Sequence, residues 1–130
     1  MIREGMGGYS VPGVNDPDKL IAGYDVAVLI EGVTIKSGQG VLARGSVIGI
    51  ITASGKGLLC DANASDGSKV ASFILAENSI DTAAADVIAT CYKTGTFNRD
   101  ALIFGVNGAP TTLDADLRNV GIYLQDEVPY

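Results

Sequence analysis

Hydrophobic and polar residues alternate along much of the chain after residue 23, with the two-residue period that is typical of half-buried β-strands. The alternation begins in residues 24–30, and Gly32 follows before a second apolar segment at 33–35, which predicts two strands separated by a turn. The run SVIGIIT at 46–52 is apolar and β-branched, and Gly49 inside it is placed for close packing or for a bulge. This part of the chain is therefore predicted to be β.

The same pattern continues toward the C-terminus in short pieces. Polar turns interrupt it at 53–57 and 61–68, because both segments are rich in glycine and in short polar side chains. Between and after these turns we expect strands at 58–60, 69–76, 87–92 and 121–124. The whole pattern predicts roughly seven or eight short strands.

Two segments have the features of short helices. Asn98 is a favourable N-cap for a helix over 99–104, and Thr112 is one for a helix that ends near residue 119, before Gly121. No βαβ repeat is present. The prediction is a mainly β single domain with one or two short helices, of a β-tulip-like, β-clip-like or barrel-like kind.

Residues 1–22 have no usable periodicity and are broken by four glycines and two prolines. Such a segment buries too little apolar surface to order itself, so we predict a flexible N-terminal arm at 1–22 and a β-rich body at 23–130. An ordinary frayed terminus would have the same composition. Fully extended, the arm would span roughly 70 Å, far beyond a small domain.

Composition narrows the possible partners. The chain has 130 residues, enough for one domain, and a net charge of −6. Its nine lysines and arginines are scattered and never adjacent, so nucleic acid is not an expected partner. No apolar run approaches the length of a membrane span, and no apolar leader segment begins the chain. We expect a soluble protein made inside the cell, without a membrane partner.

The chain contains no histidine, which removes the commonest general base and the usual metal ligand. Asp61, Asn63 and Ser65 have the spacing of calcium ligands. The loop glycine comes one position late, however, and Ser72 stands where a bidentate glutamate is needed, so Asx turns are the preferred interpretation. The glycine-rich segments also miss the phosphate-loop and dinucleotide spacings. We predict no catalytic residues, no metal site and no cofactor.

The cysteines and carboxylates likewise give no indication of a catalytic or metal site. Cys60 and Cys91 lie outside any CxxC pair, so we expect them to be buried small apolar residues rather than redox or metal groups. The fifteen carboxylates are spread through turns, which is typical of solvated loops rather than of a catalytic pair. This composition favours a structural or binding protein over an enzyme.

Three segments carry more specific residue patterns, in the order SGQGVLARGSVIGIIT at 37–52, SDGSKVASFILAEN at 65–78 and YKTGTFNRDALIF at 92–104. In the same order, they resemble three segments of the head decoration proteins of tailed bacteriophages, the family typified by the lambda capsid-stabilising protein. The segment NVGIYL at 119–124 is similar but less specific. Region 23–60 is longer than its counterpart in the lambda-type protein.

The resemblance implies a small, mostly β protein that forms homotrimers on the outer surface of the expanded capsid. There it would cement the lattice of the major capsid protein against the pressure of packaged DNA, without a cofactor and without enzymatic activity. It further implies synthesis in the cytoplasm of the bacterial host and a final place in the virion. The N-terminal arm would contact the capsid, partly as an added β-strand, with Tyr9, Val11 and Val14 as the expected contacts.

Within the segment 92–104, four residues form the signature of the fold. We expect Tyr92 to end a strand, Gly95 to permit a turn, Phe97 to fill the core and Asn98 to cap the short helix. These residues indicate family membership rather than the capsid contact.

Two other functions stay open at this point. One is a small β-rich ligand- or carbohydrate-binding accessory module, which a pocket lined by tyrosine and aspartate would support, although the chain has no tryptophan to form a sugar platform. The other is an enzyme that uses two converging carboxylates with perturbed pKa values.

Overall fold

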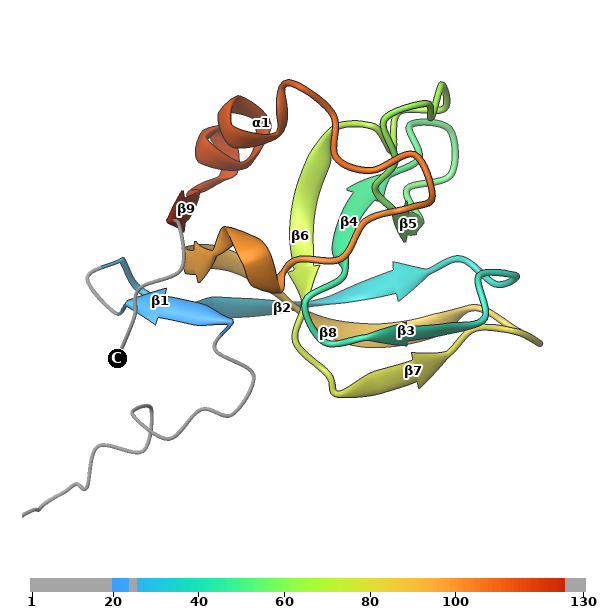
Figure 1. Ribbon diagram of the computed structural model, residues 1–130. Coiled ribbons are helices and arrows are strands. Elements are labelled where there is room, and N and C mark those ends of the chain that lie inside the picture. Colours follow the sequence, from blue (N-terminus) through green and yellow to red (C-terminus); the bar gives the residue numbers. More distant parts are fainter. Residues whose placement is uncertain (1–19, 24–25, 126–130) are drawn as a thin grey trace, which may run out of the picture.

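The computed structural model describes residues 20–23 and 26–125, which form a mainly β domain with one α-helix and one 3₁₀ helix (Figure 1). This confirms the predicted fold class. The elements, in chain order, are β1 (Ile21–Gly23), β2 (Leu29–Ile35), β3 (Val41–Ala43), β4 (Val47–Ile50), β5 (Gly57–Leu59), β6 (Ala71–Leu75), β7 (Ser79–Asp81), β8 (Val87–Asn98), η2 (Arg99–Ala101), α1 (Leu113–Val120) and β9 (Ile122–Gln125).

The twelve-residue strand β8 is the centre of the fold and pairs with four other strands. It pairs with β2 along most of its length, with β6 near its middle, and with β1 and β9 at its C-terminal end. The pairing with β9 is parallel, and the chain between these two strands passes through α1. One β-α-β crossover is therefore present, although the chain has no repeat of this unit.

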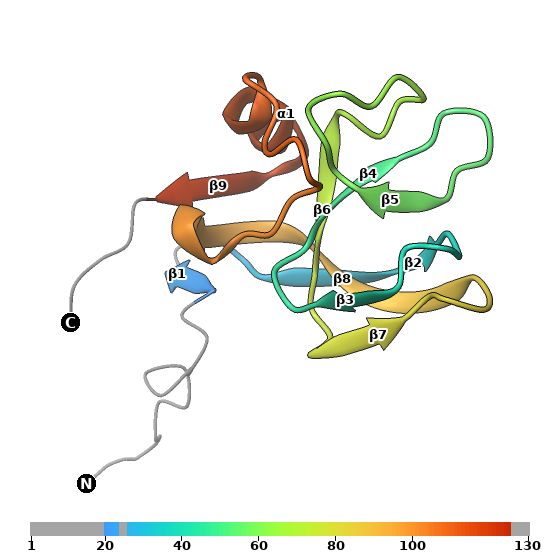
Figure 2. The same ribbon diagram turned by 45° about the vertical axis from the view of Figure 1, so that its right-hand side comes forward.

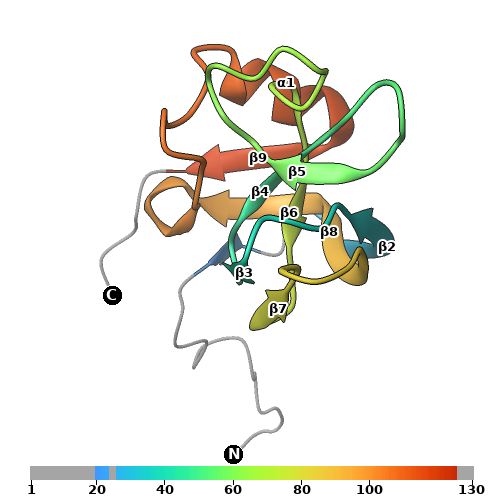
Figure 3. The ribbon, with the colours of Figure 1, turned by 90° about the vertical axis from the view of Figure 1, so that its right-hand side faces the viewer.

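The strands β8, β2, β5, β4 and β6 follow one another in the sheet, and β6 returns to pair with β8, which makes the sheet barrel-like. A separate two-stranded sheet of β3 and β7 lies below it in Figure 1, and α1 with β9 lies above β8 (Figures 2 and 3). The body therefore has a barrel between a helical cover and a small second sheet.

Two hydrophobic clusters follow from this arrangement. The first lies between the barrel and the α1–β9 cover. The second lies inside the barrel, on the side that faces β3 and β7. Their buried members are, in the first cluster, Leu20, Val47, Cys60, Ala71, Ile74, Tyr92, Phe97, Leu113, Leu117 and Ile122, and in the second Val33, Ile35, Leu42, Ile48, Leu75, Ile80, Ala89 and Cys91.

Two predictions about strand ends were wrong. Gly32 does not separate two strands, because β2 runs through it and pairs with β8 in a continuous register from Ile30 to Ile35. Tyr92 does not end a strand either, since β8 continues through Gly95 to Asn98. In both places the glycine sits inside a strand whose neighbours supply the backbone hydrogen bonds, so tertiary pairing overrides the local tendency of glycine to turn.

The helix predictions were right for one segment and wrong for the other. Helix α1 ends at Gly121, whose φ of 95° is the left-handed C-cap that the sequence predicts. The expected helix over 99–104 is only the single 3₁₀ turn η2, and Asn98 stands at its N-cap position without a side-chain capping hydrogen bond. The backbone is extended at Leu102, so the turn ends after three residues. Thr112 likewise stands at the N-cap position of α1 without a side-chain capping hydrogen bond.

The predicted arm reaches three residues too far into the chain. Leu20 is only 1% exposed, and Ile21 pairs with Phe97 on β8, so residues 20–22 belong to the body. Residues 1–19 lie outside the described residues, and their assignment to an arm stays a prediction. Among the described helices none is long and apolar enough to cross a membrane.

Candidate functional site

Two of the four signature residues of β8, Tyr92 and Phe97, lie together in the first hydrophobic cluster. The rings of Tyr92 and Phe97 have centroids 5.2 Å apart and a tilt of 45°. Phe97 is fully buried, as predicted. Gly95, with a φ of 144°, lies beneath the Phe97 ring, where an added Cβ would come within 2.9 Å of a ring carbon. The signature therefore works by packing and offers no reactive group.

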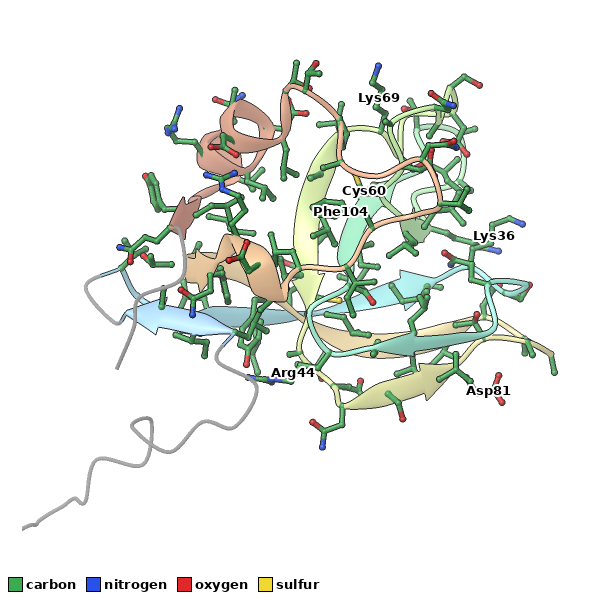
Figure 4. The ribbon with its side chains drawn as sticks, viewed as in Figure 1. Lys36, Arg44, Cys60, Lys69, Asp81 and Phe104 are labelled. Carbon is green, nitrogen blue, oxygen red and sulfur yellow. The ribbon has the colours of Figure 1, made fainter. Side chains whose placement is uncertain are left out.

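Arg44 connects this signature to the 37–52 segment. Its guanidinium lies over the Tyr92 ring, 5.4 Å from the centroid, and its Nη1 donates a 2.8 Å hydrogen bond to the Ala76 carbonyl oxygen. Figure 4 labels Arg44 on the lower side of the molecule, whereas Cys60 is buried in the first cluster and Phe104 is partly buried against it. Cation–π contacts of this kind contribute about 0.5–1 kcal/mol at exposed sites and more when desolvated.

The 65–78 segment packs on the 37–52 segment through backbone contacts. An added Cβ on Gly49 would lie only 1.9 Å from the Ser68 carbonyl oxygen, so β4 and the chain at Ser68 touch directly. Nearby, the Thr52 amide donates a 2.9 Å hydrogen bond to the Asp66 carbonyl oxygen. The three sequence segments that carry the resemblance are therefore one packed unit, which explains why their residue types are specific.

The loop at 61–68 contains Asx turns, as predicted. Asp61 Oδ1 accepts hydrogen bonds from the Asn63 amide at 2.8 Å and from Asn107 Nδ2 at 3.0 Å, and Oδ2 accepts one from the Asn107 amide at 3.1 Å. The carboxylate thus fastens the loop after β5 to the loop before α1. Within residues 20–23 and 26–125, no group of three acidic, cysteine or histidine side chains is placed to hold a metal ion.

Hydrogen bonds and nearby cations lower the pKa of four aspartates. For Asp61 the largest cause is the bond from the Asn63 amide, followed by those from Asn107. In the other three the largest cause is a hydrogen bond from a neighbouring side chain: Ser68 for Asp66, Lys56 for Asp86 and Arg99 for Asp114. In none of the four is a second carboxylate a cause, so the converging pair expected of a carboxylate enzyme is not seen here.

These lowered pKa values predict acid sensitivity. A carboxyl whose pKa is lower in the folded state stabilises the fold above its unfolded pKa, and that contribution is lost as the pH falls through the folded value. We expect the urea midpoint to fall as the pH is lowered below about 4, and to fall less in Asp61→Asn than in the wild type. A midpoint that stays constant over this range would contradict the assignment.

Both cysteines are buried free thiols, as predicted. Burial raises the pKa of Cys60 to about 11 and that of Cys91 to about 12, and nearby carboxylates add to each shift. Because the thiolate is the reactive form, these thiols are inert in the folded protein.

Thiol labelling checks this assignment. Ellman's reagent at about pH 8 is expected to leave the folded protein unlabelled and to label two thiols per chain in denaturant. Native labelling as fast as that of the denatured chain would contradict the burial of both side chains.

An open groove of about 510 Å³ lies between the barrel strands and the end of α1. Its volume falls in the range of small-molecule sites. Its two charged groups pair with each other, with Lys93 Nζ 3.7 Å from Glu31 Oε1, and its lining contains neither tyrosine nor aspartate. The groove is lined by Glu31, Ile50, Ser72, Phe73, Lys93, Thr94 and Val120. This lining gives no support to the carbohydrate-binding interpretation.

The outer face of the β2–β8 pair is an exposed surface that the sequence pattern did not predict. Ile30 is 59% exposed and Ile88 is 75% exposed, although both lie in strands of the barrel. The sequence signal for this surface is the absence of charge at alternate positions of both strands, a pattern that also fits a strand covered on that face. Tyr9, Val11 and Val14, the expected capsid contacts, lie outside the described residues.

A comparison with known proteins matches the part of the chain that contains the three packed segments. No curated protein matches the chain. A family model, bacteriophage lambda head decoration protein D, matches residues 11–121, which include every described strand except β9 and the three segments 37–52, 65–78 and 92–104. The match therefore covers most of the chain, and its members are structural components of the phage capsid rather than enzymes. The chain belongs to the bacteriophage lambda head decoration protein D family.

Proposed function

We propose that this protein is a non-enzymatic cement protein that binds as trimers to the outer surface of the expanded phage head and stabilises it. The family match over residues 11–121 carries the proposal. Its partners are the major capsid protein lattice and two further copies of itself, and its place is the outside of the virion after synthesis in the bacterial cytoplasm. Neither nucleic acid nor membrane is a partner, in keeping with the net charge of −6 and the scattered cations.

The arrangement of the body supports this role. The aromatic rings of the signature pack against each other in the core. The aspartates with lowered pKa values accept hydrogen bonds from loop amides and side chains, or pair with cations. A rigid body is what a cement needs, because a subunit that deforms easily transmits little restraint to its neighbours. Residues 1–19 join this body at Leu20, where β1 pairs with the C-terminal end of β8. Tyr9, Val11 and Val14 of the predicted arm are the proposed capsid contacts.

Cosedimentation with purified heads tests the function. Expanded heads that lack their own decoration protein are expected to bind the full chain to saturation, and unexpanded heads to bind it far less. Decorated heads should then resist heat or chelator treatment that bursts bare ones. Equal binding to both head forms, or bare and decorated heads that burst alike, would refute the proposal.

A further inference from the structure

The chain contains a single Asn-Gly pair, Asn107–Gly108, in the loop that leads from η2 to α1. Asparagine is a chemically labile residue, and a following glycine makes it most prone to lose its side-chain amide. The reason is that glycine has no Cβ to keep its backbone nitrogen away from the asparagine side chain. Asn107 is exposed, so water reaches it. The groups needed for a spontaneous modification are therefore together at this point of the surface.

The modification is a deamidation through a cyclic imide. The Gly108 nitrogen forms a bond to Asn107 Cγ, the Cγ–Nδ2 bond breaks, and the proton lost by the nitrogen leaves with Nδ2 as ammonia. Water then opens the ring at one of its carbonyl carbons, which leaves aspartate or isoaspartate at position 107. Each product has a carboxylate in place of the neutral amide, and water is the only co-reactant.

The folded chain holds the groups that this reaction must move. Asp61 Oδ1 accepts a 3.0 Å hydrogen bond from Asn107 Nδ2, and Asp61 Oδ2 accepts a 3.1 Å bond from the Asn107 amide. The Gly108 amide, which must lose its proton, donates a 2.9 Å hydrogen bond to the Gly105 carbonyl oxygen. The Gly108 carbonyl oxygen accepts a 3.1 Å bond from the Ala62 amide. These bonds fix the loop before α1 to the loop after β5 (Figure 1).

The bond to Asp61 opposes cyclisation in two ways. The Asn107 side chain must turn from Asp61 toward the Gly108 nitrogen, and that movement breaks a hydrogen bond to a charged acceptor. While the bond holds, it polarises the amide and increases the donation of Nδ2 electrons into the carbonyl, which makes Cγ a weaker electrophile. We propose that Asn107–Gly108 is a deamidation site and that Asp61 restrains its reaction in the folded protein.

Deamidation also destroys the contact that restrains it. A carboxylate at position 107 would stand against the Asp61 carboxylate, at the place where an amide N–H now donates. Like charges at that separation repel, so the side-chain bond between the two loops is lost. The change is irreversible without repair. The deamidated chain therefore opens more readily at the loop before α1.

Peptide mapping by mass spectrometry of the full chain tests the site. At physiological temperature and mildly alkaline pH, Asn107 is expected to lose its amide about tenfold faster or more in the denatured chain than in the folded wild type. Folded Asp61→Ala is expected to react about tenfold faster than the folded wild type. The matched control is Asp66→Ala, which removes an aspartate of the same loop that bonds Ser68 instead, and it is expected to react at the wild-type rate. Circular dichroism and the unfolding midpoint check that the variants are folded.

Asp61→Asn keeps the test decisive if Asp61→Ala does not fold, because it retains the shape of the side chain and removes its charge. It is expected to raise the rate about threefold or more. The restraint is overturned if the folded and denatured wild type react at equal rates, or if the folded Asp61 variants react as slowly as the wild type. It is also overturned if Asp66→Ala reacts as fast as Asp61→Ala.

A substitution that mimics the product tests the consequence. Asn107→Asp is expected to lower the urea midpoint at neutral pH, because it places the new carboxylate against Asp61. Asn107→Gln keeps an amide that reacts far more slowly, and it should lower the midpoint less. If Asn107→Asp unfolded at the wild-type midpoint, the predicted loss of the contact between the loops would be wrong.

Discussion

Replacing Gly49 with alanine is expected to destabilise the body by at least ~3 kcal/mol, at the upper end for overpacking substitutions. The added Cβ would lie 1.9 Å from the carbonyl oxygen of Ser68 and 2.6 Å from its carbonyl carbon. Both groups belong to the backbone, so no side-chain rotation relieves the clash, and β4 must move away from the chain at Ser68. Ser68 is itself 1% exposed and held by Asp66, which leaves little room for that movement.

The measurement is urea or thermal unfolding of the variant beside a matched control. Gly23→Ala makes the same chemical change in strand β1, where an added Cβ has no neighbour within 4 Å. It is expected to change the unfolding free energy by no more than about 0.5 kcal/mol. If Gly49→Ala and Gly23→Ala had the same midpoint, the close contact between the 37–52 and 65–78 segments would be wrong.

This contact shows what the sequence could and could not predict. The pattern at 46–52 predicted a strand with close packing or a bulge at Gly49. The structure has the strand β4, the close approach at Gly49 and a shift in the β4–β6 register between Ile48 and Gly49. The partner at Ser68 could not be predicted, because nothing local in either segment specifies which backbone approaches the glycine. Elements with strong local signals, such as α1 with its Gly121 cap, were predicted nearly to their ends. Gly32 and Gly95 were misjudged because pairing with β8 or β9 outweighs their local preference for turns.

Surface function was harder to predict than the fold. Tyr92 and Phe97 were correctly assigned to the body, but a role in packing is all that their contacts support. Ile30 and Ile88 fit the strand pattern equally well as buried or as exposed residues, because a period of two does not say which face another layer covers. Tertiary contacts distinguish the two cases: the Phe97 ring and the Arg44 guanidinium lie against Tyr92, whereas Ile88 is 75% exposed.

Removing residues 1–19 is expected to weaken binding to expanded heads by about 100-fold or more while the unfolding midpoint stays that of the full chain. The physical reason is multivalency, since three arms on one proposed trimer bind one lattice, and the avidity of repeated weak contacts is lost with them. The structure sets the end point of the deletion. Leu20 is buried, and its carbonyl oxygen accepts a 2.8 Å hydrogen bond from the Asn98 amide, so a deletion through residue 22 would damage the body as well.

A pair of deletions separates the two effects. Deletion of 1–22 removes the buried Leu20 and two of the three residues of strand β1, and should lower the unfolding free energy by about 2–5 kcal/mol, whereas deletion of 1–19 should not. A full-length variant with serine at Tyr9, Val11 and Val14 keeps the arm length and tests the proposed contacts alone. If the chain without residues 1–19 bound heads as tightly as the full chain, the body rather than the arm would make the capsid contacts. The exposed surfaces of the body would then be the place to look for it. If the serine variant bound normally and the deletion did not, the arm would act through its backbone, as an added β-strand does, rather than through these three side chains.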